Sequence, residues 1–128
     1  MAYDILMVDD SRTVKAVIAK SLTLAGIPVK SLSEAGNGRE GLEILRSRHV
    51  DIVFADLNMP VMGGMEMVAE IKADDSLKSI PIVVISTEGS EARIQELRER
   101  GAAAFLRKPF RPEMLKSVLE EVLGRADG

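Results

Sequence analysis

Residues 5–11, ILMVDDS, place four apolar side chains directly before two adjacent aspartates, Asp9 and Asp10. A short apolar run of this kind is typical of a strand that is buried on both faces. Two neighbouring carboxylates at the end of such a strand repel each other, and a solvated turn is the simplest explanation for them. Whether they have a function depends on which other side chains the fold brings to the same place.

The rest of the chain alternates between short apolar runs and segments with helical spacing. The expected strands are Tyr3–Val8, Val29–Glu34, Asp51–Ala55, Pro81–Ile85 and Ala103–Leu106. Two apolar stripes recur with helical spacing, namely Val14, Val17, Ile18 and Leu22, and then Leu115, Val118, Leu119 and Val122. Gly26, Gly101 and Gly124 stand where helices often end, and Pro112 suits a first helical turn.

These five strand–helix units predict an α/β fold, a doubly wound five-stranded parallel sheet of the (βα)5 flavodoxin-like kind. We take the strand order as 2-1-3-4-5, a common order for such sheets rather than one that the sequence requires. The chain has 128 residues, which suits one domain over residues 1–128, and it contains no linker or repeat.

Composition excludes several classes of protein. The formal net charge of -3 gives no reason to expect binding to nucleic acid or to a membrane surface. The absence of cysteine excludes disulfides and thiolate metal sites. The start, MAYDILMVDD, does not resemble a signal peptide, and the longest apolar stretch, IPIVVI, is too short to span a membrane. We therefore expect a soluble, cytoplasmic protein.

A second apolar run ends in a carboxylate within residues 53–60, VFADLNMP, where Asp56 follows the third expected strand. In open α/β sheets, ligands bind beyond the carboxyl ends of the strands, where the strand order reverses. With the order taken above, Asp9, Asp10 and Asp56 converge at that point. Each pair of ionised carboxylates about 5 Å apart repels by roughly 3 kcal/mol at an effective dielectric constant of about 20. Such an all-oxygen cluster predicts a hard divalent cation, for which Mg²⁺ is the best candidate.

Two further strand ends add polar groups to the same edge. Ser86 ends the fourth strand in VVIST, residues 83–87, and Lys108 follows the fifth in FLRKPF, residues 105–110. A phosphoryl group on a carboxylate needs cations to neutralise its oxygens and a hydroxyl to donate to one of them. The set therefore predicts that Asp56 is a nucleophile that carries an acyl phosphate.

Four segments together resemble the signature segments of response-regulator receiver domains. They are VDDS at 8–11, DLNMPVMGG at 56–64, VVIST at 83–87 and FLRKPF at 105–110. Residues 85–110, ISTEGSEARIQELRERGAAAFLRKPF, resemble the chemotaxis (CheY-like) group of this family somewhat more than its other groups. The resemblance runs from Tyr3 to about Leu123. It implies a two-component, phosphorelay signalling protein in which the phosphohistidine of a sensor histidine kinase phosphorylates Asp56.

The resemblance also implies a set of metal ligands. Asp10 and Asp56 would bind Mg²⁺ directly, together with the backbone carbonyl of Asn58. Asp9 would act mainly through water.

Other residues take their expected roles from the resemblance alone. Ser86 and Lys108 would bind the phosphoryl group, and Ser86 with Phe105 would form the conformational switch. A lone aromatic on a strand is more often a core residue, so the role of Phe105 has no support beyond the resemblance. A cis peptide bond is expected before Pro109.

The chain also departs from the family pattern. Gly63 stands where an aspartate is common, which loosens the start of the third helix without removing a ligand. Thr87 is larger than the residue usual after the switch hydroxyl, and it could narrow access to Asp56. Asn58 and Glu88 occupy the variable positions that tune dephosphorylation in the family.

Each candidate has a simpler explanation when taken alone. Asp10 could be a helix N-cap, Asp56 a turn residue, Ser86 a loop cap and Lys108 a solvated side chain. All of them together at four strand ends favour the functional interpretation. His49 ends the charged stretch RSRH, and we expect it to be solvated, neither ligand nor catalyst.

The sequence leaves three alternative functions to consider. An aspartate-nucleophile phosphohydrolase of the haloacid-dehalogenase type needs a D-x-D motif after the first strand, and VDDSRT lacks that spacing. A flavodoxin needs a Ser/Thr/Gly-rich phosphate loop there. A vestigial receiver that serves only as a binding module would not need every acid, Ser86 and Lys108.

The expected protein is not a turnover enzyme on an external substrate, although it catalyses its own phosphotransfer and autodephosphorylation. Phosphorylation would change a surface formed by the fourth helix, the fifth strand and the fifth helix. With no DNA-binding domain after Leu123, we expect a stand-alone receiver that controls a protein partner in trans. A flagellar motor switch and a histidine phosphotransfer protein are the two candidates, with no nucleic-acid or membrane partner.

Overall fold

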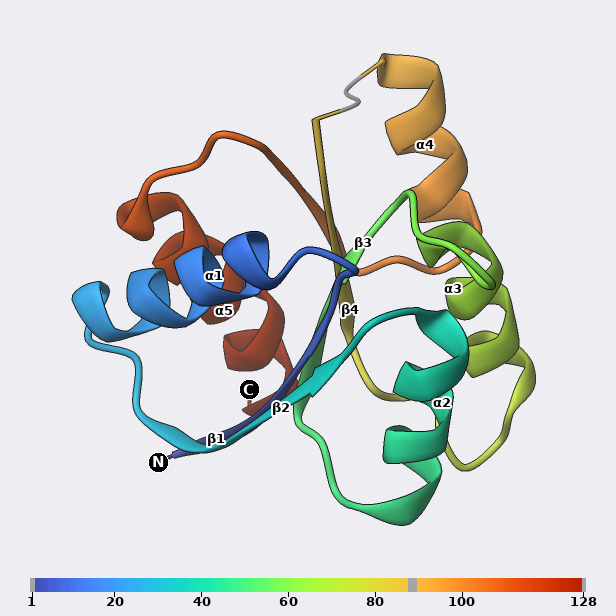
Figure 1. Cartoon of the computed structure of the whole chain (residues 1–128), viewed down its shortest axis with the longest axis horizontal. Helices are drawn as coiled ribbons and strands as arrows, with labels where there is room; N and C mark the ends of the chain where they lie inside the picture. Colours follow the sequence, from blue (N-terminus) through green and yellow to red (C-terminus); the bar gives the residue numbers. More distant parts are fainter. Residues whose placement is uncertain (1, 88–89, 128) are drawn as a thin grey trace.

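The computed structural model describes residues 2–87 and 90–127, which form five strands and five helices in strict alternation (Figure 1). The strands are β1 (Tyr3–Val8), β2 (Val29–Ala35), β3 (Ile52–Asp56), β4 (Ile82–Ser86) and β5 (Ala104–Arg107). The helices are α1 (Arg12–Leu24), α2 (Gly38–Ser47), α3 (Gly64–Ala73), α4 (Glu91–Glu99) and α5 (Pro112–Asp127).

The strands form one parallel sheet in the order β2-β1-β3-β4-β5, which confirms the predicted doubly wound fold. In Figure 1, α1 and α5 cover one face of the sheet, and α2, α3 and α4 cover the other. The strand order reverses between β1 and β3, so the carboxyl ends of these two strands border the crevice where ligands bind in such sheets.

The apolar runs of the central strands are explained by helices on both faces. Side chains alternate along a strand, so each strand supplies both cores. In β1, Ile5 and Met7 belong to the core beneath α1 and α5, while Leu6 and Val8 belong to the core beneath the other three helices. All four side chains are at most 1% exposed. Their burial in the two cores fixes the position of the carboxyl end of β1.

The observed strand boundaries differ from the predicted ones by one residue at several ends. β3, β4 and β5 each begin one residue later and end one residue later than expected, and β2 extends to Ala35. The apolar pattern cannot locate these ends, because the ladder hydrogen bonds continue through the first polar residue. Asp56 and Ser86 are consequently the last residues of their strands rather than loop residues.

The predicted helix ends are right at two glycines and wrong at the third. Gly26 and Gly101 follow α1 and α4 with φ of 72° and 109°, a conformation that side-chain-bearing residues rarely adopt. Gly124 lies inside α5, which continues to Asp127 without a left-handed residue. One apolar stripe is also wrong in part: Val17 is 50% exposed because Ile18 and Leu22 define the buried side of α1.

The first residues of α1 and α5 show which side chains begin these two helices. Ser11 caps α1, since its side-chain oxygen accepts a hydrogen bond from the Val14 amide at 3.2 Å. The suggestion that Asp10 is this N-cap is therefore wrong, and its carboxylate is left for another role. Pro112 begins α5, as predicted. Within the described residues, no helix combines the length and apolar character that crossing a membrane requires.

Candidate functional site

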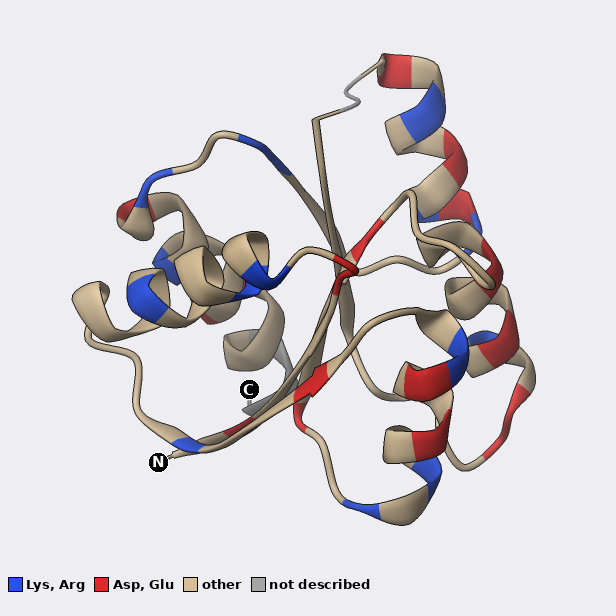
Figure 2. Ribbon diagram, in the orientation of Figure 1, with Lys and Arg blue, Asp and Glu red and all other residues tan. Residues whose placement is uncertain are grey.

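Three carboxylates meet where the carboxyl ends of β1 and β3 lie side by side. Asp9 follows β1 and is 3% exposed, Asp10 is exposed, and Asp56 ends β3. Each offers one oxygen, and these oxygens lie within 4.8 Å of one another. Figure 2 shows the acidic ends of the two strands converging near the middle of the sheet. The structure thus confirms the predicted convergence of the three acids.

One lysine balances part of this negative charge. The Lys108 Nζ lies 3.5 Å from Asp9 Oδ2 and 3.4 Å from Asp56 Oδ1. Its backbone amide donates to the Ser86 carbonyl at 2.9 Å, which extends the pairing of β4 and β5 beyond Arg107. The peptide bond between Lys108 and Pro109 is cis, as expected. The ammonium group is therefore positioned between the buried Asp9 and the carboxylate of Asp56.

The protonation of Asp56 is shifted by its surroundings. Desolvation by burial raises the pKa of Asp56 above its ordinary value, and the negative charge of Asp9 raises it further. The Lys108 ammonium acts in the opposite direction but does not cancel the effect of burial. The folded protein therefore holds an Asp56 carboxylate that is less stable as an anion than the same group in water. A bound cation would stabilise this carboxylate anion, so the position favours cation binding.

Replacing Asp56 with asparagine should make the metal-free protein more stable at neutral pH. Because the folded-state pKa is raised, folding is favoured when Asp56 is protonated, and this contribution is lost as the pH rises through the folded pKa. The asparagine variant escapes that loss. Thermal melts in chelator should show a higher melting temperature for Asp56→Asn at neutral pH, with the difference shrinking as the pH falls below the folded pKa of Asp56. A constant difference across this range would contradict the assignment of the cost to the Asp56 charge.

The donor set fits Mg²⁺. All three side chains present oxygen, with neither nitrogen nor sulfur among the ligand atoms, and this is the chemistry that hard divalent cations require. Asp9 uses Oδ1 to accept the Ser11 amide at 2.8 Å and turns Oδ2 toward Lys108, so both of its oxygens are engaged. The exposed Asp10 is the more available ligand. Asn58, two residues beyond β3, is exposed beside the site, and its backbone carbonyl remains a predicted ligand.

The switch and tuning residues lie on β4, β5 and the loop that follows β4. Ser86 is 1% exposed at the end of β4. Phe105 on β5 is partly buried against the core beneath α2, α3 and α4, opposite Val84 in the strand register. Thr87 is exposed, whereas Glu88 lies outside the described residues. These positions are compatible with the predicted roles, which stay predictions.

One positioning residue was missed by the sequence reasoning. A Cβ on Gly64 would overlap the backbone carbonyl oxygen of Asp56, and the Gly64 amide donates to Leu57 at 2.9 Å. Only glycine lets α3 approach the end of β3 this closely. Gly63 is the N-cap of α3 and provides no side-chain hydrogen bond, and the loosened helix start expected there stays a prediction. The pair of glycines in MGG was the available signal.

Comparison with known proteins agrees with this geometry. The family model described as response regulator receiver domain matches residues 5–120. The chain is 37% identical over 124 residues to the chemotaxis protein CheY1 of Helicobacter pylori, covering 96% of this chain and 98% of that protein. The structure of the chemotaxis response regulator CheY4 of Vibrio cholerae matches with a TM-score of 0.84 and 34% identity, covering 95% of this chain and 99% of that one.

A third match is a complex. The structure of CheX and CheY with BeF3 and Mg²⁺ from Borrelia burgdorferi aligns with a TM-score of 0.85 and 25% identity, covering 94% of this chain and 89% of that one. The comparisons give no support to a phosphohydrolase or to a vestigial module. A receiver of this kind is a signalling protein rather than a turnover enzyme. The chain belongs to the response-regulator receiver domain family and is homologous to the CheY chemotaxis regulators.

Proposed function

We propose that this chain is a single receiver domain that accepts a phosphoryl group on Asp56 from the phosphohistidine of a sensor histidine kinase. The observation that carries the proposal is the placement of Lys108 Nζ at 3.4 Å from Asp56 Oδ1, beside two further carboxylates. A carboxylate with a fixed cation on one side and a cation-binding cluster on the other is arranged to receive a phosphoryl group.

The transfer is a displacement at phosphorus. An oxygen of the Asp56 carboxylate attacks the phosphorus, the phosphorus–nitrogen bond to the donor imidazole breaks, and the imidazole leaves with the bonding electron pair. The product is an acyl phosphate. Lys108 and Ser86 would bind the phosphoryl oxygens, and water would later attack phosphorus to release inorganic phosphate and restore Asp56. Asn58, Thr87 and Glu88 would set the rate of this last step.

The carboxylates of Asp9, Asp10 and Asp56, with the Asn58 backbone carbonyl, would hold Mg²⁺. A bound Mg²⁺ supplies positive charge that reduces repulsion between the carboxylates and the incoming phosphoryl oxygens. Asp10 and Asp56 would be direct ligands. Asp9, whose oxygens already serve Ser11 and Lys108, would act through water.

Incubation with acetyl phosphate should add one phosphoryl group to the protein when Mg²⁺ is present. Chelation should reduce uptake to background, because the repulsion among the acids is then left without a counter-charge. Intact-mass spectrometry measures the uptake, and the adduct should survive acid and be lost in base, as acyl phosphates are. Uptake that is equal with and without chelator would contradict the role given to the carboxylate cluster.

We further propose that phosphorylation acts on the surface formed by α4, β5 and α5. Ser86 ends β4, the strand beside β5, and Phe105 lies one strand away. If the Ser86 hydroxyl moves toward the phosphoryl group, Phe105 could rotate into the space behind β4. The receiver would then shift between two arrangements of this surface without a large backbone change. Arg93, Arg100, Arg107 and Arg111 lie in or beside it, where a partner's acidic patch could contact them.

Replacing Ser86 with alanine should separate binding from switching. Beryllofluoride with Mg²⁺ should shift wild-type amide resonances both at the acid cluster and across residues 86–114. In Ser86→Ala, the shifts at the acid cluster should remain and most of the distal ones should be lost. Nuclear magnetic resonance spectra of both proteins make the comparison. Distal shifts that persist unchanged in the variant would assign the coupling to another residue, such as Lys108.

The downstream partner is a protein that acts in trans. The relatives named as chemotaxis proteins favour a flagellar motor switch, and a histidine phosphotransfer protein is the second candidate. The relative solved with CheX, BeF3 and Mg²⁺ supports both the cation and a protein partner for the activated form. Since sensor kinases phosphorylate their regulators inside the cell, we place this receiver in the cytoplasm.

A further inference from the structure

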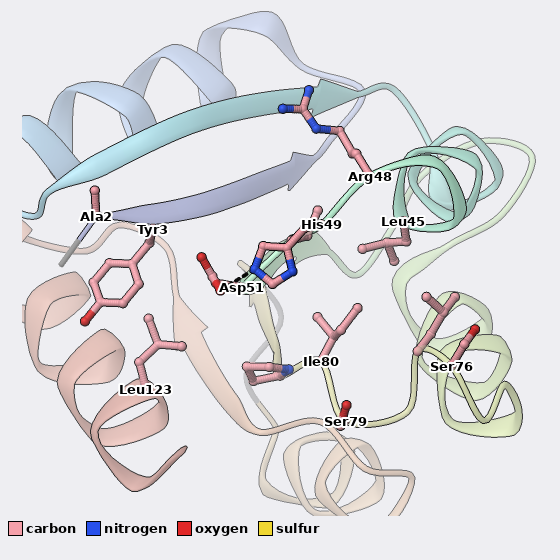
Figure 3. Close-up of a pocket in the computed structure, with 13 residues that line it drawn as sticks. Ala2, Tyr3, Leu45, Arg48, His49, Asp51, Ser76, Ser79, Ile80 and Leu123 are labelled. Carbon is pink, nitrogen blue, oxygen red and sulfur yellow. Dashed lines mark hydrogen bonds and ion pairs between the residues drawn. The ribbon is translucent and has the colours of Figure 1, made fainter. Parts of the chain in front are cut away.

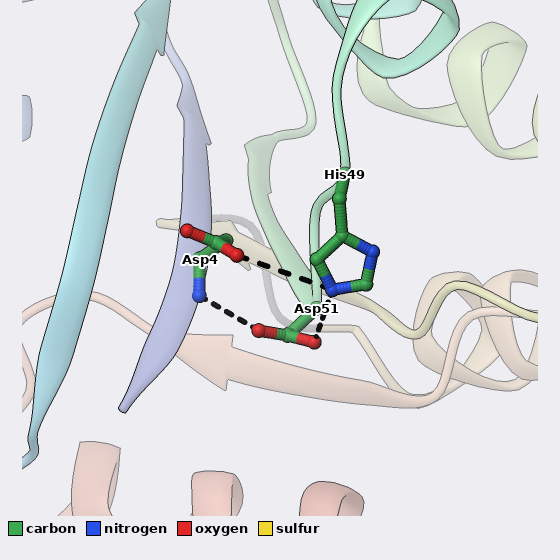
Figure 4. Close-up of side chains that lie close together, drawn as sticks. All are labelled: Asp4, His49 and Asp51. Carbon is green, nitrogen blue, oxygen red and sulfur yellow. Dashed lines mark hydrogen bonds and ion pairs between the residues drawn. The ribbon is translucent and has the colours of Figure 1, made fainter. Parts of the chain in front are cut away.

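A second cluster of side chains that could bind a metal lies at the amino ends of β1 and β3, at the end of the sheet opposite to Asp56. It consists of Asp4 on β1, Asp51 just before β3, and His49 in the loop between α2 and β3 (Figure 4). His49 Nε2 lies 2.8 Å from Asp51 Oδ1 and 4.0 Å from Asp4 Oδ2. β1 and β3 thus carry a carboxylate cluster at each end.

The two carboxylates are held by their other oxygens. The Asp4 amide donates to Asp51 Oδ2 at 2.7 Å, and the Ser31 hydroxyl donates to Asp4 Oδ1. The Asp51 amide in turn donates to the Asp4 carbonyl. One oxygen of each carboxylate is therefore fixed by a strand, and the remaining oxygen of each is turned toward the imidazole. Fixing a ligand through its second oxygen is how proteins orient carboxylates that bind metals.

No lysine or arginine among the described side chains neutralises these two carboxylates. Neither Asp4 nor Asp51 forms an ion pair with such a residue there, and His49 is the ionisable side chain next to both. Arg48 lines the same hollow, of about 530 Å³, but its guanidinium is directed away from the imidazole (Figure 3). His49 and Asp51 also line this hollow, whereas Asp4 does not, so an ion can reach the cluster from solvent on the side of His49 and Asp51.

The ligand types differ from those around Asp56. The chain has one histidine and no cysteine, so His49 is its one imidazole and this cluster is its one combination of a ring nitrogen with carboxylates. Imidazole with carboxylate favours ions such as Zn²⁺ over Mg²⁺. Two ligands that are each about 2.1 Å from one ion lie about 3.0–3.4 Å apart. The observed 2.8 and 4.0 Å lie on either side of this range, and the His49 side chain, 72% exposed, is free to adjust.

We propose that His49, Asp4 and Asp51 form a binding site for a divalent transition-metal ion of the Zn²⁺ type, distinct from the carboxylate cluster around Asp56. The ion would link the start of β1 to the loop that enters β3. Water would complete its coordination on the solvent side.

The test titrates Zn²⁺ into the full chain with excess Mg²⁺ present, at mildly alkaline pH because binding requires deprotonated imidazole. His49 gives the only imidazole signals, so its ring ¹⁵N resonances report this site alone. We expect them to shift to a plateau at one equivalent of Zn²⁺, and the melting temperature should rise because the ion binds only the folded state.

Three variants decide the assignment. His49→Gln should abolish the rise in melting temperature with Zn²⁺, and Asp51→Asn should weaken the Zn²⁺ affinity measured at His49 at least about tenfold. Asp75→Asn is the matched control, because the Asp75 side chain is 95% exposed and does not belong to the cluster, and it should leave the affinity unchanged. Imidazole resonances that do not move would overturn the proposal. An Asp51→Asn affinity equal to that of wild type would also overturn it, since it would show that His49 binds the ion without the carboxylates. Because Mg²⁺-dependent phosphorylation is not measured, either result leaves the function proposed for Asp56 untouched.

Discussion

Asp56→Asn is expected to reduce phosphoryl uptake from acetyl phosphate to background, the largest effect that any single substitution in this chain should have. The amide cannot act as the nucleophile, while its size and shape keep the end of β3 intact. The variant should also be at least as stable as wild type without metal, since burial raises the pKa of Asp56 and the charged form is disfavoured. Thermal melts of the variant check this stability, and with the fold intact a loss of uptake reports the loss of the nucleophile.

The matched control for this substitution is Asp75→Asn, which removes the same charge from a carboxylate whose side chain is 95% exposed. It should take up one phosphoryl group like wild type. Intact-mass spectrometry on the three proteins under identical conditions gives the comparison. Uptake by Asp56→Asn equal to that of the control would place the nucleophile on another residue.

Asp10→Asn should abolish most of the stabilisation that Mg²⁺ gives to the folded protein. Asp10 is exposed and free of the bonds that engage Asp9, so its oxygens are the ones available to an ion. Asp9→Asn should weaken the effect less, since Asp9 is already bonded to the Ser11 amide and faces Lys108. Without metal, Asp10→Asn should be more stable than wild type because one of three repelling charges is gone.

Thermal melts with and without Mg²⁺ separate these effects, because an ion that binds only the folded state raises the melting temperature with its concentration. Wild type should show the largest rise, Asp9→Asn a smaller one and Asp10→Asn almost none. A rise in Asp10→Asn that matches wild type would remove Asp10 from the ligand set.

The sheet and its acidic edge were predictable because buried parallel strands have a strong signature. The apolar runs before Asp10 and Asp56 have side chains that point to both faces of the sheet, and both faces are buried. The ends of these runs therefore locate the crevice to within one residue. Helix ends were less certain. Gly26 adopts a left-handed conformation that the sequence can suggest, whereas Gly124 lies inside α5, which continues to Asp127.

Other features depend on contacts between distant segments, which a single sequence does not contain. The approach of Gly64 to the Asp56 carbonyl is set by the packing of α3 against the sheet. The pairing of His49 with Asp4 joins residues far apart in the chain. From the charged stretch around His49 we expected a solvated side chain that is neither ligand nor catalyst, and the metal site proposed above departs from the second part of that expectation. The exposure of His49 is confirmed, but its two carboxylate neighbours became visible only in the fold.

The most direct test of the account is to locate the phosphoryl group itself. Borohydride reduces an aspartyl phosphate to homoserine, which marks the modified residue permanently, and peptide mass spectrometry then identifies its position. After phosphorylation with Mg²⁺, we predict homoserine at position 56 and at no other aspartate. Homoserine at position 9 or 10, or phosphorylated protein that yields none, would contradict the claim that Asp56 is the phosphoryl acceptor.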